Sequence, residues 1–208
     1  GAVEFRLDSA GSIAEVFPHQ ILINPEMPIP RAASRVSGIT DDQVAGAPTF
    51  AKVARKIRGV LENAVLVAHN LSFDVNFLRS ELERVDLAWP PTRAELDTLP
   101  LSQRLLPELR SHRLESVCNA LGVDLSNAHR AVHDAEACGR VLIELCQRKQ
   151  APADFAGFLE WSGGIGPPPE TGHLVIGASG VAEFCFGPHQ GATVEEHPDY
   201  LQWMTMAL

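Results

Sequence analysis

The chain has 208 residues, of which 45% are hydrophobic, and a formal net charge of −9. That length suits one well-cored domain with a small appendage, because single domains commonly contain roughly 100–200 residues. The sequence shows no signal sequence and no apolar run near the roughly 20 residues of a membrane span, so we expect a cytoplasmic protein with no membrane partner. The acidic balance argues against tight nonspecific binding to duplex nucleic acid but leaves nucleic acid open as a substrate.

The four cysteines, Cys118, Cys138, Cys146 and Cys185, lie far apart in the sequence. None forms a Cys-x-x-Cys pair, which argues against a zinc ribbon or a disulfide framework and for reduced thiols. We therefore interpret them as small core residues.

An antiparallel hairpin is predicted at the start of the chain. Residues 1–7 and 12–23 have the composition of strands, and residues 8–11 form the turn between them. Asn24-Pro25 and the prolines that follow end the second strand. Because Gly1 begins in the middle of a predicted strand, we expect natural sequence upstream of it.

Segments with the apolar pattern of a strand alternate with segments that have the pattern of a helix over the next hundred residues, which predicts an α/β fold. Ala64–Ala68 is an all-apolar run typical of a strand covered on both faces. Residues 95–98 lead into a helix that ends at Leu106, and further helices are predicted at 49–62, 71–85, 114–121 and 132–147. Units of strand, loop and helix in this order are typical of a sheet flanked by helices.

The predicted helix 49–62 carries a group of basic residues, Lys52, Arg55, Lys56 and Arg58. A solvated outer face is the simpler interpretation of this group, and a nucleic-acid contact is the alternative.

The composition changes sharply after residue 160. Residues 161–180 contain six glycines and three consecutive prolines, as expected for an exposed linker. We therefore predict one large domain at 1–150, a Pro/Gly-rich linker at 151–180 and a small module at 181–208. Four aromatic residues would form the core of this module: Phe184, Phe186, Tyr200 and Trp203.

Two aspartates stand where a helix turns its apolar stripe toward the interior. Asp74 precedes Phe77 and Leu78 by one turn, and Asp134 precedes Cys138 in the same way. A buried unpaired carboxylate costs several kcal/mol, so a metal cation is the simplest partner for both. Each aspartate alone would more simply be a helix cap, but the pair together with nearby histidines favours a metal-dependent hydrolytic site.

One of three histidines is a candidate for the site. His129 lies in the loop before the last helix, where an imidazole can take a proton from water near neutral pH. His112 and His133 match no common zinc spacing, and we expect them to be exposed. Glu136 is two residues from Asp134 and therefore points to a different helix face, so we do not assign it as a ligand.

The motifs together resemble the DEDD exonucleases of the histidine subtype, a family that includes the epsilon proofreading subunits of bacterial DNA polymerase III. The matching segments are Gly38-Ile39-Thr40, Ala68-His69-Asn70 with Phe73-Asp74, Asp97-Thr98, and His129-Arg130-Ala131 with Asp134-Ala135. The resemblance covers roughly residues 1–147 and implies a ribonuclease H-like fold, in which a mixed five-stranded sheet is flanked by helices.

The resemblance also implies roles for individual residues. Asp74 and Asp134 would bind two Mg²⁺ or Mn²⁺ ions, and His129 would position or deprotonate the attacking water during 3′-5′ hydrolysis of DNA or RNA. The remaining matches would hold the nucleotide at the single-stranded 3′ end: Gly38, Ile39, Thr40, Asn70 and Phe73. Alternatively, Phe73 is a core residue and Thr40 only caps a helix.

The chain departs from the family pattern in three places. The family's Asp-x-Glu on the first strand has no counterpart here, which fits either natural sequence upstream or a catalytically defective protein that binds nucleic acid or serves as a scaffold. Ser37 replaces a histidine found in many relatives. The module at 181–208 looks like one appended to some bacterial exonucleases, where it is a candidate docking surface for a polymerase or other protein, but Pro188 and Gln190 replace the usual lysines.

Overall fold

The computed structural model describes residues 1–8, 12–125, 130–164, 166, 174–176, 182–184 and 191–198. The strands are β1 (Ala2–Leu7), β2 (Ile13–His19), β3 (Val65–Ala68), β4 (Ala94–Asp97), β5 (Leu174–Ile176) and β6 (Ala182–Phe184). The helices are α1 (Arg31–Ser37), α2 (Asp41–Val44), α3 (Phe50–Leu61), α4 (Leu71–Glu83), α5 (Thr98–Leu105), α6 (Leu114–Leu121), α7 (Ala131–Arg148) and α8 (Phe155–Ser162). Within these residues, we find no helix with the length and apolar character to cross a membrane.

Strands β1 and β2 form the predicted antiparallel hairpin. Their register pairs Ala2 with His19 and Arg6 with Glu15. The prediction that the second strand continues to residue 23 is wrong, because β2 ends at His19. The predicted turn falls mostly on residues 9–11, which lie outside the described part of the chain.

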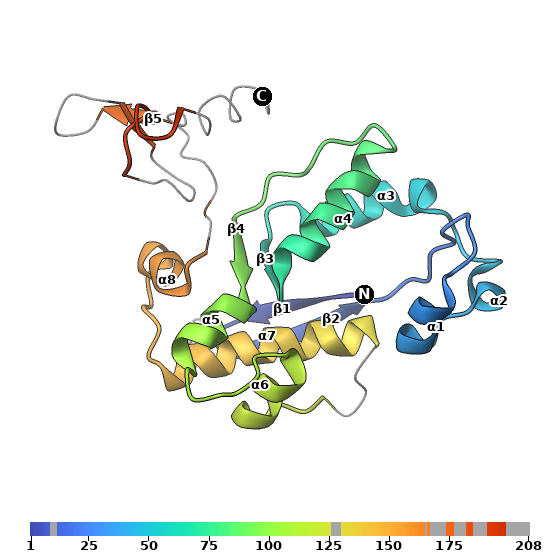
Figure 1. Ribbon diagram of the computed structural model, residues 1–208, viewed down its shortest axis with the longest axis horizontal. Coiled ribbons are helices and arrows are strands. Elements are labelled where there is room, and N and C mark those ends of the chain that lie inside the picture. The colour runs from blue at the N-terminus through green and yellow to red at the C-terminus, as the bar shows by residue number, and fades with distance from the viewer. Residues whose placement is uncertain are drawn as a thin grey trace.

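Strands β3 and β4 are parallel, and their register places Ala68 beside Asp97. Each strand leads directly into a helix, β3 into α4 and β4 into α5. The two helices therefore start side by side at one edge of this sheet, as Figure 1 shows. All four residues of β3 are partly rather than fully buried, so the expectation of a strand covered on both faces holds only in part.

The described strands do not form a single five-stranded sheet. Instead, β1–β2, β3–β4 and β5–β6 are separate two-stranded sheets. The long helix α7 joins the first two, because it packs against both β1 and β3 (Figure 1). At the crossing with β1, Gly139 touches the ring of Phe5 so closely that a side chain at this position would collide with it. A larger residue at position 139 would therefore force the Phe5 ring to move.

The main hydrophobic core lies between α5, α6 and α7. Its fully buried members include Val117, Cys118, Val141 and Leu145. Helix α6 ends as predicted at Gly122, whose φ of 72° is the left-handed conformation that glycine adopts without strain. Cys118 and Cys138 are buried as predicted and Cys146 is partly buried, whereas Cys185 lies outside the described residues.

Helix α8 falls inside the segment 151–180, for which the composition predicts a linker. Its Trp161 packs on the main core, and the Arg104 guanidinium donates to the Trp161 carbonyl. Gly164 lies directly against Leu96 of β4. Residues just beyond 150 therefore pack on the domain, although the two boundaries between the three predicted segments stay predictions.

The C-terminal part contains the antiparallel pair β5–β6, and a bridge joins Glu183 to Thr193. Phe184 is buried at 1% exposure, as expected for a core residue of this module. The other three aromatic residues assigned to that core lie outside the described part of the chain.

Candidate active site

One carboxylate fixes the starts of two helices at the edge of the β3–β4 sheet. Asp97 accepts hydrogen bonds from the backbone N–H groups of Asn70 and Leu71, both at 2.9 Å, at the start of α4. It also caps α5 by accepting from Leu99 N at 2.9 Å. Sequence reasoning gave Asp97 no role. The signal it missed is an aspartate at the end of a short, half-buried strand, where a helix must begin.

A second set of hydrogen bonds connects this edge to the segment before α6. His69 lies 2.7 Å from the carbonyl of His112 through Nε2 and 2.9 Å from the Thr98 hydroxyl through Nδ1. Because a carbonyl can only accept, Nε2 of His69 carries a proton. The Thr98 hydroxyl donates to the Ala68 carbonyl at 3.2 Å. Cys138 of α7 lies 3.3 Å from the same Thr98 oxygen. His69 and Thr98 thus connect β3, α5, α7 and the 106–113 loop.

Asp74 lies in the first turn of α4, next to but not in its buried stripe. That stripe consists of Leu71, Val75 and Leu82, so the expectation that Asp74 points inward with Phe77 is wrong. The helix rotates about 100° per residue, which places Asp74 at the edge of the stripe and Phe77 beyond it. Although Asp74 is exposed, desolvation by the surrounding protein, followed by the charge of Asp97, raises the pKa of its carboxyl.

Asp134 lies in the first turn of α7, on the stripe that continues through Cys138 and Val141, as predicted. It is partly buried, and its charge adds to the effect of burial in raising the pKa of the Cys118 thiol to about 11.

The start of β1 connects the two aspartates. Gly1 packs so closely on α7 that a Cβ there would lie 2.6 Å from Val132 N, and its backbone nitrogen lies close enough to Asp74 for the two groups to interact. The first turns of α4 and α7 therefore border one region around the beginning of β1.

An exposed aromatic pair flanks Asp74 on α4. Phe73 and Phe77 are 60% and 61% exposed, and their ring centroids are 4.9 Å apart. The alternative that Phe73 is a core residue is therefore wrong. Two large apolar side chains left in water beside a carboxylate indicate a surface that meets another molecule.

The other residues expected to hold a nucleotide have local structural roles. Asn70 has a φ of 77°, a left-handed conformation that asparagine tolerates, and it begins α4. Gly38 ends α1 with a φ of 70°. Ile39 follows, and Thr40 N donates to the Gln43 side chain at 2.9 Å, which gives Thr40 the predicted capping role at α2. Figure 1 shows α1 and α2 apart from the start of α4.

The three candidate histidines differ in their surroundings. His129 lies outside the described residues, directly before Arg130, which precedes α7. His112 is partly buried and its Nε2 lies 3.0 Å from the Leu106 carbonyl, so the expectation that it is exposed is wrong. His133 is exposed, as expected.

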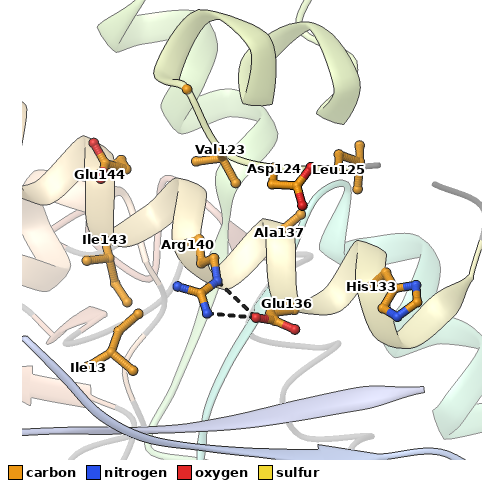
Figure 2. Close-up of a pocket in the computed structure, with 11 residues that line it drawn as sticks. Ile13, Val123, Asp124, Leu125, His133, Glu136, Ala137, Arg140, Ile143 and Glu144 are labelled. Carbon is orange, nitrogen blue, oxygen red and sulfur yellow. Dashed lines mark hydrogen bonds and ion pairs between the residues drawn. The ribbon is translucent and has the colours of Figure 1, made fainter. Parts of the chain in front are cut away.

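A pocket of about 420 Å³ lies along another side of α7 and is not part of this site. As Figure 2 shows, it is lined by α7, the loop after α6 and Ile13, and neither Asp74 nor Asp134 borders it. Within it, Arg140 binds the Glu136 carboxylate through two nitrogens at 3.0 and 2.7 Å. Glu136 is thus neutralised by its own helix, in agreement with its exclusion as a ligand.

The described residues supply the type of ligand that divalent cations prefer, but too few of these ligands to hold two ions. Carboxylate oxygens are the ligands that Mg²⁺ and Mn²⁺ prefer, and Asp74 and Asp134 supply them. However, within the described ranges no group of three His, Cys, Asp or Glu side chains could hold a metal ion. This part of the chain therefore supplies only a fraction of a two-ion coordination set.

The buried thiol of Cys138 predicts a specific loss of stability at high pH. Burial raises its pKa from 9.0 to about 12, so the folded protein keeps a proton that the unfolded chain loses above pH 9. Stability should therefore fall as the pH rises from about 9 towards about 12, with a contribution of about 1 kcal/mol lost at pH 10. Urea unfolding at pH 8 and pH 10 would measure it. A Cys138→Ala variant should lack this contribution, and an identical pH dependence in both proteins would contradict the assignment.

Comparisons with known proteins place this geometry in a family. The family model RNase_T, described as Exonuclease, matches residues 1–142. The DNA polymerase III PolC-type protein of Oceanobacillus iheyensis is 41% identical over 138 residues, which is 66% of this chain and 10% of that protein. Its Bacillus subtilis counterpart is 36% identical over 138 residues, 65% of this chain and 9% of that protein. The chain thus spans about a tenth of the length of these relatives.

Solved structures show the same fold. The nuclease domain of 3′hExo, a DEDDh family member bound to rAMP, aligns with a TM-score of 0.57 at 20% identity, covering 70% of this chain and 79% of that one. Exonuclease X in complex with 5′ overhanging duplex DNA aligns with a TM-score of 0.55 at 23% identity, covering 77% and 87%. The fold is therefore the ribonuclease H-like α/β fold that the motifs imply. The family model, which matches about two thirds of the residues, establishes that the chain belongs to the exonuclease family that this model describes.

Proposed function

We propose that this protein hydrolyses phosphodiester bonds at the 3′ end of DNA or RNA with the help of Mg²⁺ or Mn²⁺. The observation that supports this most directly is the placement of Asp74 and Asp134 in the first turns of two helices that both border the start of β1. An exposed Phe73–Phe77 pair lies beside the first of these carboxylates. Carboxylates next to an aromatic surface suit a polymer with charged phosphates and stacking bases.

Each site residue has a role in this proposal. Asp74 and Asp134 would hold divalent cations, and such ions activate water and offset charge on the leaving oxygen when bound. His129 would accept a proton from the attacking water. The bases near the 3′ end would stack on Phe73, and Asn70 with the loop Gly38, Ile39 and Thr40 would contact the terminal nucleotide. The fixed start of α4, held by Asp97, keeps Asp74 in place without the need for reorganisation.

The names of the relatives support a cellular role and a type of partner for this protein. The DNA polymerase III names of the matched proteins favour a bacterial, cytoplasmic role close to a polymerase, which could dock on the module at 181–208. The choice between DNA and RNA depends on contacts with the 2′-hydroxyl group. Comparing the rates on DNA and RNA strands of the same sequence measures this preference.

A second function has an observation in its favour. The described residues supply two carboxylates, fewer than a two-ion site needs, so a protein that binds 3′ ends without cutting them would show the same geometry. Such a protein would serve as a binding or scaffold module.

A labelled-strand assay separates the two functions. Purified protein is incubated with single-stranded DNA or RNA carrying a 5′ label, in Mn²⁺, in Mg²⁺ or in EDTA. We expect a ladder of shortened strands and release of nucleoside monophosphates that stop in EDTA. A strand that is bound but stays at full length would contradict the enzyme and support the binding module. Shortening from the 5′ end, seen with a 3′ label, would contradict the proposed polarity.

The His129→Ala variant tests the proposed general base. A general base acts on the chemical step, so we expect kcat to fall by about 100-fold or more while KM changes little. Single-turnover rates and substrate titrations measure the two parameters separately. The neighbouring exposed His133→Ala variant is the control and should keep both values. A KM increase as large as the loss in kcat would show that His129 binds substrate instead.

A further inference from the structure

Helix α3 presents an outer face that contains cations and small residues only. Its inner side is fixed by Ala54, which is 1% exposed, and by partly buried Val53 and Ile57. The opposite face carries Lys52, Arg55 and Lys56, all exposed, with Ala51 and Gly59 beside them. The sequence of α3 contains no acidic residue, although the chain as a whole has a net charge of −9.

The three cations of this face have no acidic partner in the described part of the chain. Ion pairs elsewhere engage Arg6, Arg84, Arg140 and Arg148, each with a glutamate on its own or a neighbouring element. On α3 itself, only Arg58 is paired, with Glu62 at 3.4 Å, and it also donates to the Ala88 carbonyl. Three like charges within two turns repel one another, so this face is stabilised when an anion binds.

Gly59 gives an independent indication of a close partner. It lies seven residues, or about two turns, after Lys52 and therefore on the same side of the helix. A Cβ built on it meets nothing within 4 Å. Glycine inside a helix costs roughly 1 kcal/mol relative to alanine, and no described contact requires it here. A glycine that the fold does not need leaves room for the backbone of another molecule to approach.

We infer that this α3 face, made of Lys52, Arg55, Lys56 and Gly59, binds the phosphate backbone of the nucleic acid whose 3′ end enters the active site. This inference rests on the proposed function and extends it to a second contact. Helix α3 packs on α4, whose first turn carries Asp74 (Figure 1). A strand held at its 3′ end near Asp74 and at its phosphates on α3 would be bound by charge and not by sequence. The basic group is then more than a solvated surface.

The test measures binding separately from cutting. Fluorescence anisotropy in EDTA follows a 20-nucleotide single strand and a trinucleotide, each across a range of salt concentrations. The variant is Lys52→Gln with Arg55→Gln and Lys56→Gln. The control, Arg6→Gln with Arg140→Gln and Arg148→Gln, has the same change in net charge but removes only paired cations. Thermal unfolding confirms that both proteins fold.

We expect the α3 variant to bind the long strand about 10-fold or more weakly, with a salt slope smaller by about 2, because each phosphate contact contributes about 0.7 for single strands. The trinucleotide and the control should show no such change. Gly59→Ala should raise the melting temperature but weaken binding to the long strand, and Gly59→Glu should weaken that binding further. Unchanged affinity of the α3 variant, or an equal loss in the control, would overturn the inference. A wild-type protein that binds but never cuts would instead defeat the proposed function alone.

Discussion

Replacing either aspartate of the candidate site, as Asp74→Asn or Asp134→Asn, should abolish exonuclease activity while the protein stays folded. The amide keeps the shape of the side chain but loses the charge that a divalent cation needs, so we expect a fall in kcat of about 1000-fold or more, or about 4 kcal/mol of transition-state stabilisation. Initial rates on a labelled single strand, measured over a range of Mn²⁺ concentrations, would show it. Asp74 is exposed, so its replacement should change the free energy of unfolding by no more than about 0.5 kcal/mol.

Glu136→Gln provides the matched control for these variants. Glu136 lies two residues after Asp134 on the same helix, but its carboxylate is bound by Arg140. Its replacement should leave the rate within about two-fold, because surface ion pairs contribute little. If Asp74→Asn retained full activity while Glu136→Gln lost it, the site would have to be moved to the pocket on the other side of α7.

Asp97→Ala should cause the largest loss of stability of any single polar substitution in the site. The change removes three hydrogen-bond acceptor contacts to backbone N–H groups at two helix starts. Each cap typically contributes about 1 kcal/mol, and donors left without a partner cost more, so we expect a loss of about 3 kcal/mol. Urea unfolding at pH 7 would measure it, and Asp97→Asn, which keeps one oxygen, should lose less.

Asp154→Ala offers a direct comparison. Asp154 caps only α8, through one bond of 2.8 Å to Gly157 N. Its replacement should cost about 1 kcal/mol. If Asp97→Ala and Asp154→Ala lowered the free energy of unfolding by the same amount, Asp97 would be an ordinary helix cap. Its hydrogen bonds to two helices would then add no further stability.

Most of the helices of the main domain could be predicted because their apolar periodicity is strong. The predictions for 49–62, 71–85, 114–121 and 132–147 lie within two residues of α3, α4, α6 and α7. Helix α1 was missed, and it has no buried residue, so its sequence carries no apolar stripe to detect. Helix α8 was missed because the nearby prolines and glycines obscure an eight-residue pattern.

The site was predicted in part, for physical reasons that differ between residues. Asp134 lies on the buried stripe of α7, so periodicity correctly indicated its direction. For Asp74 the same reasoning failed, because Phe77 looked like a core residue yet is 61% exposed. The role of Asp97 depends on which helix start lies beside β4, and this long-range pairing of β3 with β4 cannot be read from local patterns.

The shared carboxylate of Asp97 also has a mechanical consequence. Because one side chain holds the first residues of both α4 and α5, neither helix can shift along its axis without breaking a bond to the other. A force applied at one helix, such as the pull of a departing strand, is transmitted to its neighbour and through Thr98 to α7. This edge of the β3–β4 sheet therefore moves as one unit with the starts of α4 and α5.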